Sequence, residues 1–94
     1  MDPRFPIGPF VFKPDPSQAE RNACIAAIER APAALRAAVS GLDDEQLDTP
    51  YREGGWSSRQ VVHHLFDSNA NAFIRFRLAL TEDHPRITAY NEAL

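Results

Sequence analysis

Residues 57–80, SSRQVVHHLFDSNANAFIRFRLAL, decide the fold that this sequence predicts. The stretch contains neither glycine nor proline, and its apolar residues recur at the spacing of one helix face. Ser57 and Gln60 match the S-x-x-Q pattern of a capping box, in which side chains satisfy free N–H groups of the first helical turn. We therefore expect a helix of roughly 30 Å that runs to about Leu80, before the proline at position 85.

An earlier helix is predicted to begin near Ser17, because Ser17 and Glu20 match a second capping-box pattern. Apolar residues then recur at mostly helical spacing, with alanines between them: Ile25, Ile28, Leu35 and Val39. Pro32 interrupts this pattern, so the helix is expected either to kink there or to break at Ala31. Gly41 suits the position just past the helix end, where the backbone commonly becomes left-handed.

Between the two long helices, residues 41–55 (GLDDEQLDTPYREGG) are rich in turn-forming side chains. Asp43 or Asp44 could cap one short turn that carries Leu47. No β-hairpin signal, repeat or low-complexity tract is present in the sequence. The sequence thus predicts an all-α chain with two long helices, which are too few to close a bundle.

The first sixteen residues differ in composition from the rest of the chain. Residues 1–16 contain five of the eight prolines, and a proline lacks the N–H group that helices and central strands require. Their phenylalanine and aliphatic side chains are nevertheless too apolar for a free tail. We expect residues 1–16 to form an extended arm that packs on the bundle, and residues 17–94 to form the helical domain.

Composition and charge limit the classes of function. The 94 residues suffice for one small domain with a modest core. A net charge of −3 argues against nucleic acid as a partner, because phosphate binding needs a concentrated basic surface. Cys24 is the single cysteine, so no disulfide can form within the chain, and a reducing, cytoplasmic location is expected. No signal peptide and no apolar stretch of membrane-spanning length is recognisable.

The long second helix carries two adjacent histidines, His63 and His64. Neighbouring residues on a helix are rotated by about 100°, so the two imidazoles cannot point the same way. Both lie equally far from the centre of the apolar face, and periodicity alone does not choose between them. His63 precedes Asp67 by four residues and could pair with it on a wet surface. His64 shares its side of the helix with three polar residues: Ser68, Asn71 and Arg75.

A polar seam of this kind, beside an apolar face, is where helical bundles build metal sites. A mononuclear site needs three or more protein ligands, however, and one helix cannot supply them all. A solvated imidazole is therefore the simpler reading of either histidine, and His84 is expected to be ordinary loop surface. The residues by themselves predict a small helical module with one unusual polar seam.

Residues 47–92, LDTPYREGGWSSRQVVHHLFDSNANAFIRFRLALTEDHPRITAYNE, resemble the YfiT-like branch of the DinB superfamily. The resemblance extends to FPIG at residues 5–8 and to APAAL at residues 31–35, and so covers nearly the whole chain. Its most specific part is PYREGGW followed by RQVVHHL. The family comprises predicted metal-dependent hydrolases and bacillithiol-type thiol S-transferases.

The resemblance implies an up-and-down four-helix bundle with a mononuclear metal site, usually zinc or nickel, at one end. In the superfamily pattern W-x(7)-H, the ligand lies eight residues after the tryptophan, which from Trp56 is His64. His63 would then orient the site or face outward, and Asp67 and Ser68 are candidates to hydrogen-bond the ligand from behind. Relatives often have histidine where this chain has Asn69, a change we expect to affect only the surroundings of the site.

The family's other two ligands form an H-x-x-x-H pair in a late helix, and this chain contains no such pair. Relatives are nearly twice as long, so residues 17–94 correspond to the N-terminal half of the bundle. The expected function is therefore part of a hydrolase or low-molecular-weight-thiol S-transferase, which acts on a small molecule through a metal-activated water or thiolate. The alternative is an incomplete half-bundle that homodimerises through its apolar face and serves as an interaction module.

Overall fold

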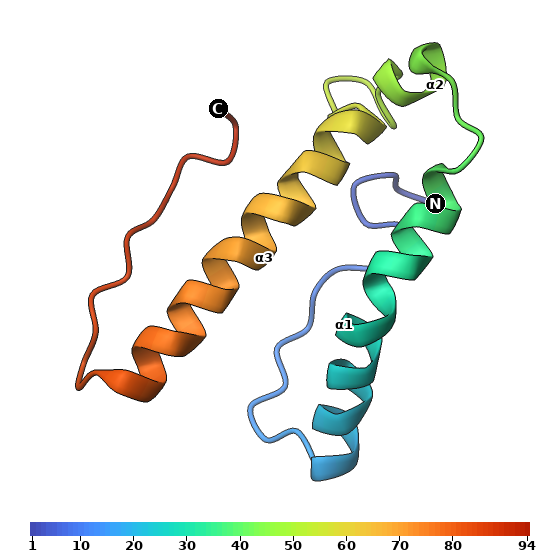
Figure 1. Cartoon of the computed structure of the whole chain (residues 1–94). Coiled ribbons are helices and arrows are strands. Elements are labelled where there is room, and N and C mark those ends of the chain that lie inside the picture. The colour runs from blue at the N-terminus through green and yellow to red at the C-terminus, as the bar shows by residue number, and fades with distance from the viewer.

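The computed structural model describes residues 1–94 and contains three helices, α1 (Gln18–Val39), α2 (Asp44–Asp48) and α3 (Ser58–Thr81). Figure 1 shows α1 and α3 as two long rods of opposite direction, joined at one end by α2 and its flanking loops. An isolated bridge between Pro50 and Ser57 is the only β-type pairing. The predicted all-α class, with two long helices and one short turn, is confirmed.

Helix α3 begins as the sequence predicts. The hydroxyl of Ser57 accepts a hydrogen bond from the backbone N–H of Gln60 at 3.2 Å, and the Gln60 side chain accepts one from the Ser57 N–H at 2.9 Å. Both halves of the capping box are therefore formed. The helix ends at Thr81, one residue beyond the expected end.

Helix α1 departs from the prediction at two points. The Ser17 hydroxyl accepts from the Glu20 N–H, but the Glu20 carboxylate binds Lys13 of the N-terminal arm instead of closing the capping box. The helix also continues through Pro32, so the predicted alternative of a break is wrong. A proline removes one hydrogen bond of the ladder, and the helical residues on both sides carry the helix past it. Gly41 has φ +83°, as its position after the helix predicts.

Helix α2 is capped by Asp43, whose carboxylate accepts from the Gln46 N–H at 2.8 Å. It is tied to α3 by Arg59, which pairs with Asp48 at 2.7 Å and Asp44 at 3.0 Å. These hydrogen bonds, chiefly the one to Asp48, raise the pKa of the Arg59 guanidinium. Arg59 therefore fixes the short helix against the start of α3.

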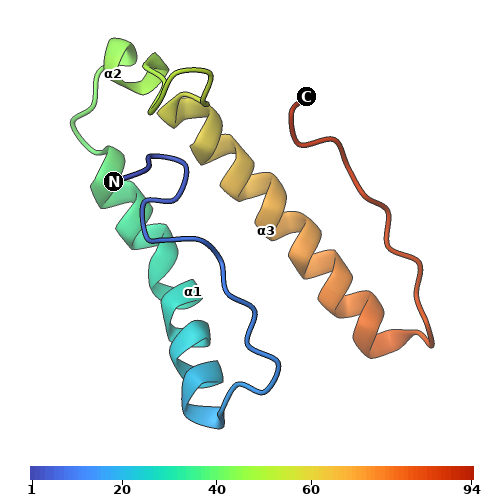
Figure 2. The ribbon, with the colours of Figure 1, turned by 180° about the vertical axis from the view of Figure 1, so that it is seen from behind.

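The N-terminal arm has no helix or strand before Ser17. In Figures 1 and 2 it lies alongside α1, at the side toward α3. Its apolar side chains remain exposed, with Ile7 at 99% and Phe10 at 88% of their full accessible area. That the arm packs on a complete bundle stays a prediction.

No residue of the chain is buried, because the two long helices stand apart. Between them lies an apolar groove of about 610 Å³. Its lining is contributed by α1 and α3: Ile28, Ala31, Pro32, Leu35, Val62, Leu65, Phe66, Asn69 and Ala70. The amphipathic pattern thus marks the correct faces, but nothing in the chain covers them.

The segment after α3 reverses direction at His84, whose φ of +49° is rare for a residue other than glycine. Pro85 follows, and residues 86–94 run back along α3 toward its first turn (Figures 1 and 2). Sequence periodicity gives no sign of this path. The reversal brings the end of the chain beside the region that contains His63 and His64. None of the helices is both long and apolar enough to span a lipid bilayer.

Candidate functional site

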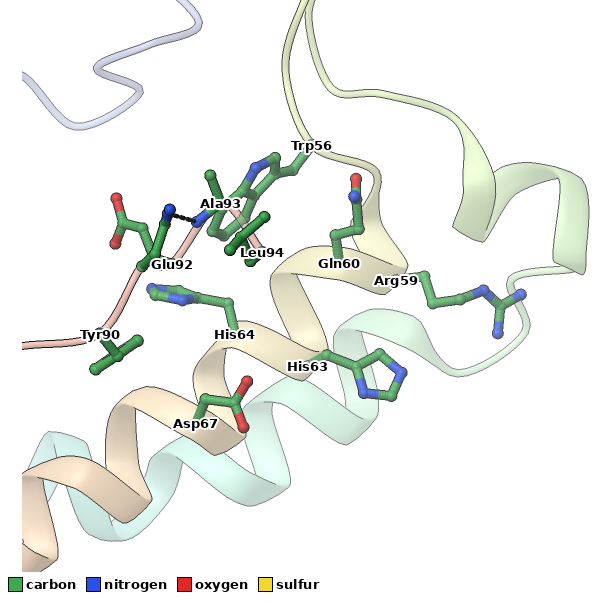
Figure 3. A pocket seen from close by; sticks show the side chains of 11 residues that line it. Trp56, Arg59, Gln60, His63, His64, Asp67, Tyr90, Glu92, Ala93 and Leu94 are labelled. Carbon is green, nitrogen blue, oxygen red and sulfur yellow. Dashed lines mark hydrogen bonds between the residues drawn. The ribbon is translucent and has the colours of Figure 1, made fainter.

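A cavity of about 280 Å³ lies at the N-terminal end of α3 (Figure 3). One wall is formed by the first turns of α3 and the residue before its cap, and the other by the returning C-terminal segment. The lining residues are Trp56, Arg59, Gln60, His63, His64, Asp67, Tyr90, Asn91, Glu92, Ala93 and Leu94. Both adjacent histidines contribute to its lining.

The two adjacent histidines differ in their surroundings. The His64 side chain points toward the C-terminal segment, whereas His63 points away from it (Figure 3). His64 is half-buried and His63 is exposed. The imidazole of His64 also lies edge-on against the indole of Trp56, with ring centroids 4.9 Å apart and planes inclined at 68°. A packed aromatic neighbour restricts the orientation of the imidazole, so His64 is the better prepared of the two as a ligand.

The other residues named from the sequence are placed differently. Asp67 lines the same pocket but is exposed, and it forms no ion pair with His63. Ser68 is half-buried on the same side as His64, one turn further along α3, and does not line the pocket. Asn69 lines the groove toward α1, and its amide donates to the Leu65 carbonyl at 2.7 Å. The side chain at position 69 is therefore separate from the His64 pocket.

Charge in the pocket is predominantly negative. Arg59 already holds Asp44 and Asp48, while Asp67 and Glu92 have no basic partner. An imidazole beside unpaired carboxylates attracts a cation rather than an anion. Glu92 and Tyr90 were not foreseen, because the sequence ITAYNEAL has no helical or strand period that would place it.

The residues present do not form a complete metal site. No group of three or more histidine, cysteine or acidic side chains is close enough to hold one ion, and a catalytic site requires three protein ligands. His84 cannot contribute, because it lies beyond the far end of α3 with its side chain 94% exposed beside Asp83. The chain offers one enclosed imidazole, the single ligand that the resemblance implies.

Comparison with known proteins gives the family. The family model described as DinB superfamily matches residues 27–93. The chain belongs to the DinB superfamily. The predicted resemblance is therefore confirmed over most of the sequence.

Among solved structures, this DinB-superfamily chain is similar to YfiT from Bacillus subtilis, described as "a probable metal-dependent hydrolase with an unusual four-helix bundle topology". The TM-score is 0.91 at 46% sequence identity, over 99% of this chain and 53% of YfiT. Helices α1 and α3 thus correspond to part of a four-helix bundle, which confirms the predicted fold class.

Two sequence relatives carry the name "putative metal-dependent hydrolase". One, from Geobacillus thermodenitrificans (strain NG80-2), is 52% identical over 99% of this chain and 53% of its own length. The other, from Bacillus cereus (strain B4264), is 50% identical over 97% of this chain and 53% of its own length. This DinB-superfamily chain therefore spans about half the length of the relatives it matches.

Proposed function

We propose that this chain is the His64-bearing half of a metal-dependent hydrolase. The observation that carries the proposal is the half-buried imidazole of His64, held edge-on by Trp56 in an acidic pocket. Two relatives whose sequences are 52% and 50% identical to this chain are named as metal-dependent hydrolases. The remaining ligands would come from polypeptide that packs over the groove between α1 and α3, and the metal would be zinc or nickel.

Within such a site, His64 would supply one neutral imidazole, and Trp56 would keep the ring from rotating. Asp67 is the pocket carboxylate on the same helix, and it would interact with groups bound near His64. Ser68 and His63 would not bind the metal and would contact only the residues around His64. When bound, the metal acts as a Lewis acid that activates a water for hydrolysis or a thiol for transfer.

A small molecule is the substrate class that fits the pocket. The volume of about 280 Å³ is just below the range of typical ligand pockets, roughly 300–1,000 Å³. Hydrolysis and low-molecular-weight-thiol S-transfer use the same kind of centre, and the relatives' names favour hydrolysis. A cytoplasmic location, expected from the single cysteine, would supply reduced thiols for the second reaction.

The test is to purify the chain together with the polypeptide that covers its groove, because the chain alone has no complete metal site. This completed protein is loaded with zinc or nickel, and two reactions are assayed in parallel. One is the hydrolysis of simple ester and amide substrates, and the other is the transfer of a low-molecular-weight thiol to an electrophile. We expect activity that disappears with a chelator and with His64→Ala, but survives Asn69→Ala, because Asn69 faces the groove. Activity that is insensitive to the chelator, or no activity with any metal, would overturn the proposal.

A second function, self-association as an interaction module, is supported by the exposed area. A folded monomer of 10.5 kDa is expected to expose about 5,400 Å², whereas this chain exposes 8508 Å². The excess of about 3,000 Å² exceeds the roughly 800 Å² that each partner loses in a standard interface. A second copy presents the same apolar groove, and two copies would supply four long helices around a two-fold axis.

Sedimentation of the chain distinguishes the two proposals. Self-association predicts a dimer that Leu35→Asp, in the groove, converts to monomer, while the control Ile7→Asp, in the exposed arm, leaves it intact. A wild-type chain that stays monomeric at all concentrations would exclude self-association. The hydrolase proposal, in which further polypeptide covers the groove, does not depend on this result.

A further inference from the structure

The polar seam of α3 is less exposed than the large apolar side chains of the same helix. His64, Ser68, Asn71 and Arg75 follow one another at intervals of three or four residues and share one side of the helix. All four are half-buried. The large apolar side chains of the same helix are mostly exposed: Phe66 at 75%, Phe73 at 61%, Phe76 at 72% and Leu80 at 84%. The C-terminal segment runs along α3 (Figure 1) and lies beside His64 in the pocket (Figure 3). At the other end of the seam, its Thr88 carbonyl meets Arg75.

One side chain joins this segment to the helix. The guanidinium of Arg75 donates a hydrogen bond to the Thr88 carbonyl at 3.1 Å and lies 5.9 Å from the centre of the Tyr90 ring. No other hydrogen bond connects residues 84–94 with α3. Because this is the one hydrogen bond between the segment and the helix, the path of residues 84–94 along α3 depends on Arg75.

The contact between Arg75 and Thr88 lies at a distance from His64 that the rest of the segment can span. Arg75 follows His64 by eleven residues, which is about 16 Å along a helix. An extended chain covers roughly 3.3 Å per residue. A segment that is fixed at Thr88 and runs antiparallel to α3 therefore needs about four or five residues to reach the level of His64. The residues at that level are Glu92 and Ala93, which line the pocket.

We propose that Arg75 is the positioning residue of the His64 pocket: by binding Thr88 and Tyr90, it holds the C-terminal segment as the wall that carries Glu92. The planar guanidinium is suited to this task, because it can donate to a carbonyl while it faces an aromatic ring. Arg75 itself lies outside the pocket lining, so it acts through the segment and not on the ligand.

Arg77 provides a matched control in the same helix. It is the same residue type two positions further on, and its guanidinium lies 5.5 Å from the centre of the Phe73 ring instead of contacting the C-terminal segment. Replacing either arginine by methionine removes one positive charge and keeps a straight side chain of good helix propensity. A difference between the two variants therefore reports on the contact with Thr88 and Tyr90.

The first readout is independent of metal and of activity. Trp56 is the only tryptophan and lines the pocket beneath the C-terminal segment. We expect the acrylamide quenching constant of Trp56 to rise by about twofold in Arg75→Met, because local opening exposes the indole. Arg77→Met should match the wild type, and Tyr90→Leu should reproduce part of the rise. Equal quenching in wild type and Arg75→Met, or an equal rise in both arginine variants, would overturn the inference.

The second readout rests on the proposed function. In the protein completed by the polypeptide over the groove and loaded with metal, Arg75→Met should lower kcat/KM by about tenfold, as misplacement of a pocket wall does, with the bound metal unchanged. Arg75→Lys should recover little, since an ammonium group cannot reproduce the planar contact. If the wild type has no activity, the proposed function fails while the fluorescence result still decides the role of Arg75. If activity is present but equal in Arg75→Met and wild type, the positioning role is excluded.

Discussion

The imidazole of His64 lies edge-on against the indole of Trp56, with 4.9 Å between the ring centres. Trp56 directly precedes the helix cap, so its side chain can fold over the first turns of α3. His64 is thereby distinguished from His63, which has the same chemistry but lies exposed. The contact explains physically why a ligand eight residues after a tryptophan would have a fixed orientation.

The first prediction separates the adjacent histidines. In the metal-binding form of the protein, His64→Ala should weaken zinc or nickel binding by more than about 100-fold, the upper end of what loss of an orienting partner costs. His63→Ala should weaken it by less than about tenfold, because His63 would touch only the surroundings of the ion. Isothermal titration of the purified variants measures both affinities. Equal losses would contradict the assignment of His64.

The second prediction concerns the end of α1. Gly41 has φ +83°, and a Cβ built there would meet no atom within 4 Å. Gly41→Ala should therefore reduce the free energy of unfolding by about 1–2 kcal/mol through backbone strain alone. Urea denaturation followed by circular dichroism measures the change. An unchanged denaturation midpoint would mean that the left-handed turn is not retained in solution.

The third prediction concerns the loop before Trp56. A Cβ on Gly55 would lie 2.6 Å from Cγ of Arg52 and 3.2 Å from the Arg52 carbonyl oxygen. Gly55→Ala should destabilise the protein by about 1–3 kcal/mol, as overpacking does, and should shift the emission of Trp56. Gly41→Ala is the control, because its strain is remote from the tryptophan and should leave the emission spectrum unchanged.

The fourth prediction tests the helix that continues through Pro32. In a peptide of residues 17–41, Pro32→Ala should increase helicity, because proline in a helix interior costs about 3 kcal/mol relative to alanine. Pro32→Gly should increase it less, since glycine costs about 1 kcal/mol. Circular dichroism at low temperature compares the three peptides. The opposite order would imply that Pro32 is not interior to the helix in solution.

The sequence predicted the features that depend on near neighbours. The capping box of Ser57 and Gln60 and the left-handed Gly41 each follow from side chains within a few positions. For the short helix the sequence left Asp43 and Asp44 open, and the structure selects Asp43. The capping box of Ser17 formed only in part, because Lys13 competes for the Glu20 carboxylate. The four-residue pattern from Ser17 to Glu20 does not include Lys13, so it cannot predict this ion pair.

The remaining features depend on contacts between distant segments. The break considered at Pro32 did not occur, since the cost of one missing hydrogen bond is local while the helix extends on both sides. The path of residues 86–94 depends on Arg75, which the sequence placed in the polar seam without a partner. Periodicity identifies which faces are apolar, but it cannot identify what covers them.

The separation of α1 from α3 also determines the order in which the protein can assemble. Both walls of the His64 pocket come from one continuous stretch, residues 56–94, and the entropy cost of closing a loop grows only slowly with its length. Individual helices form within about a microsecond, so the pocket can organise while the groove is still open. Covering the groove is then the slow step, and its rate depends on protein concentration if a second copy provides the cover.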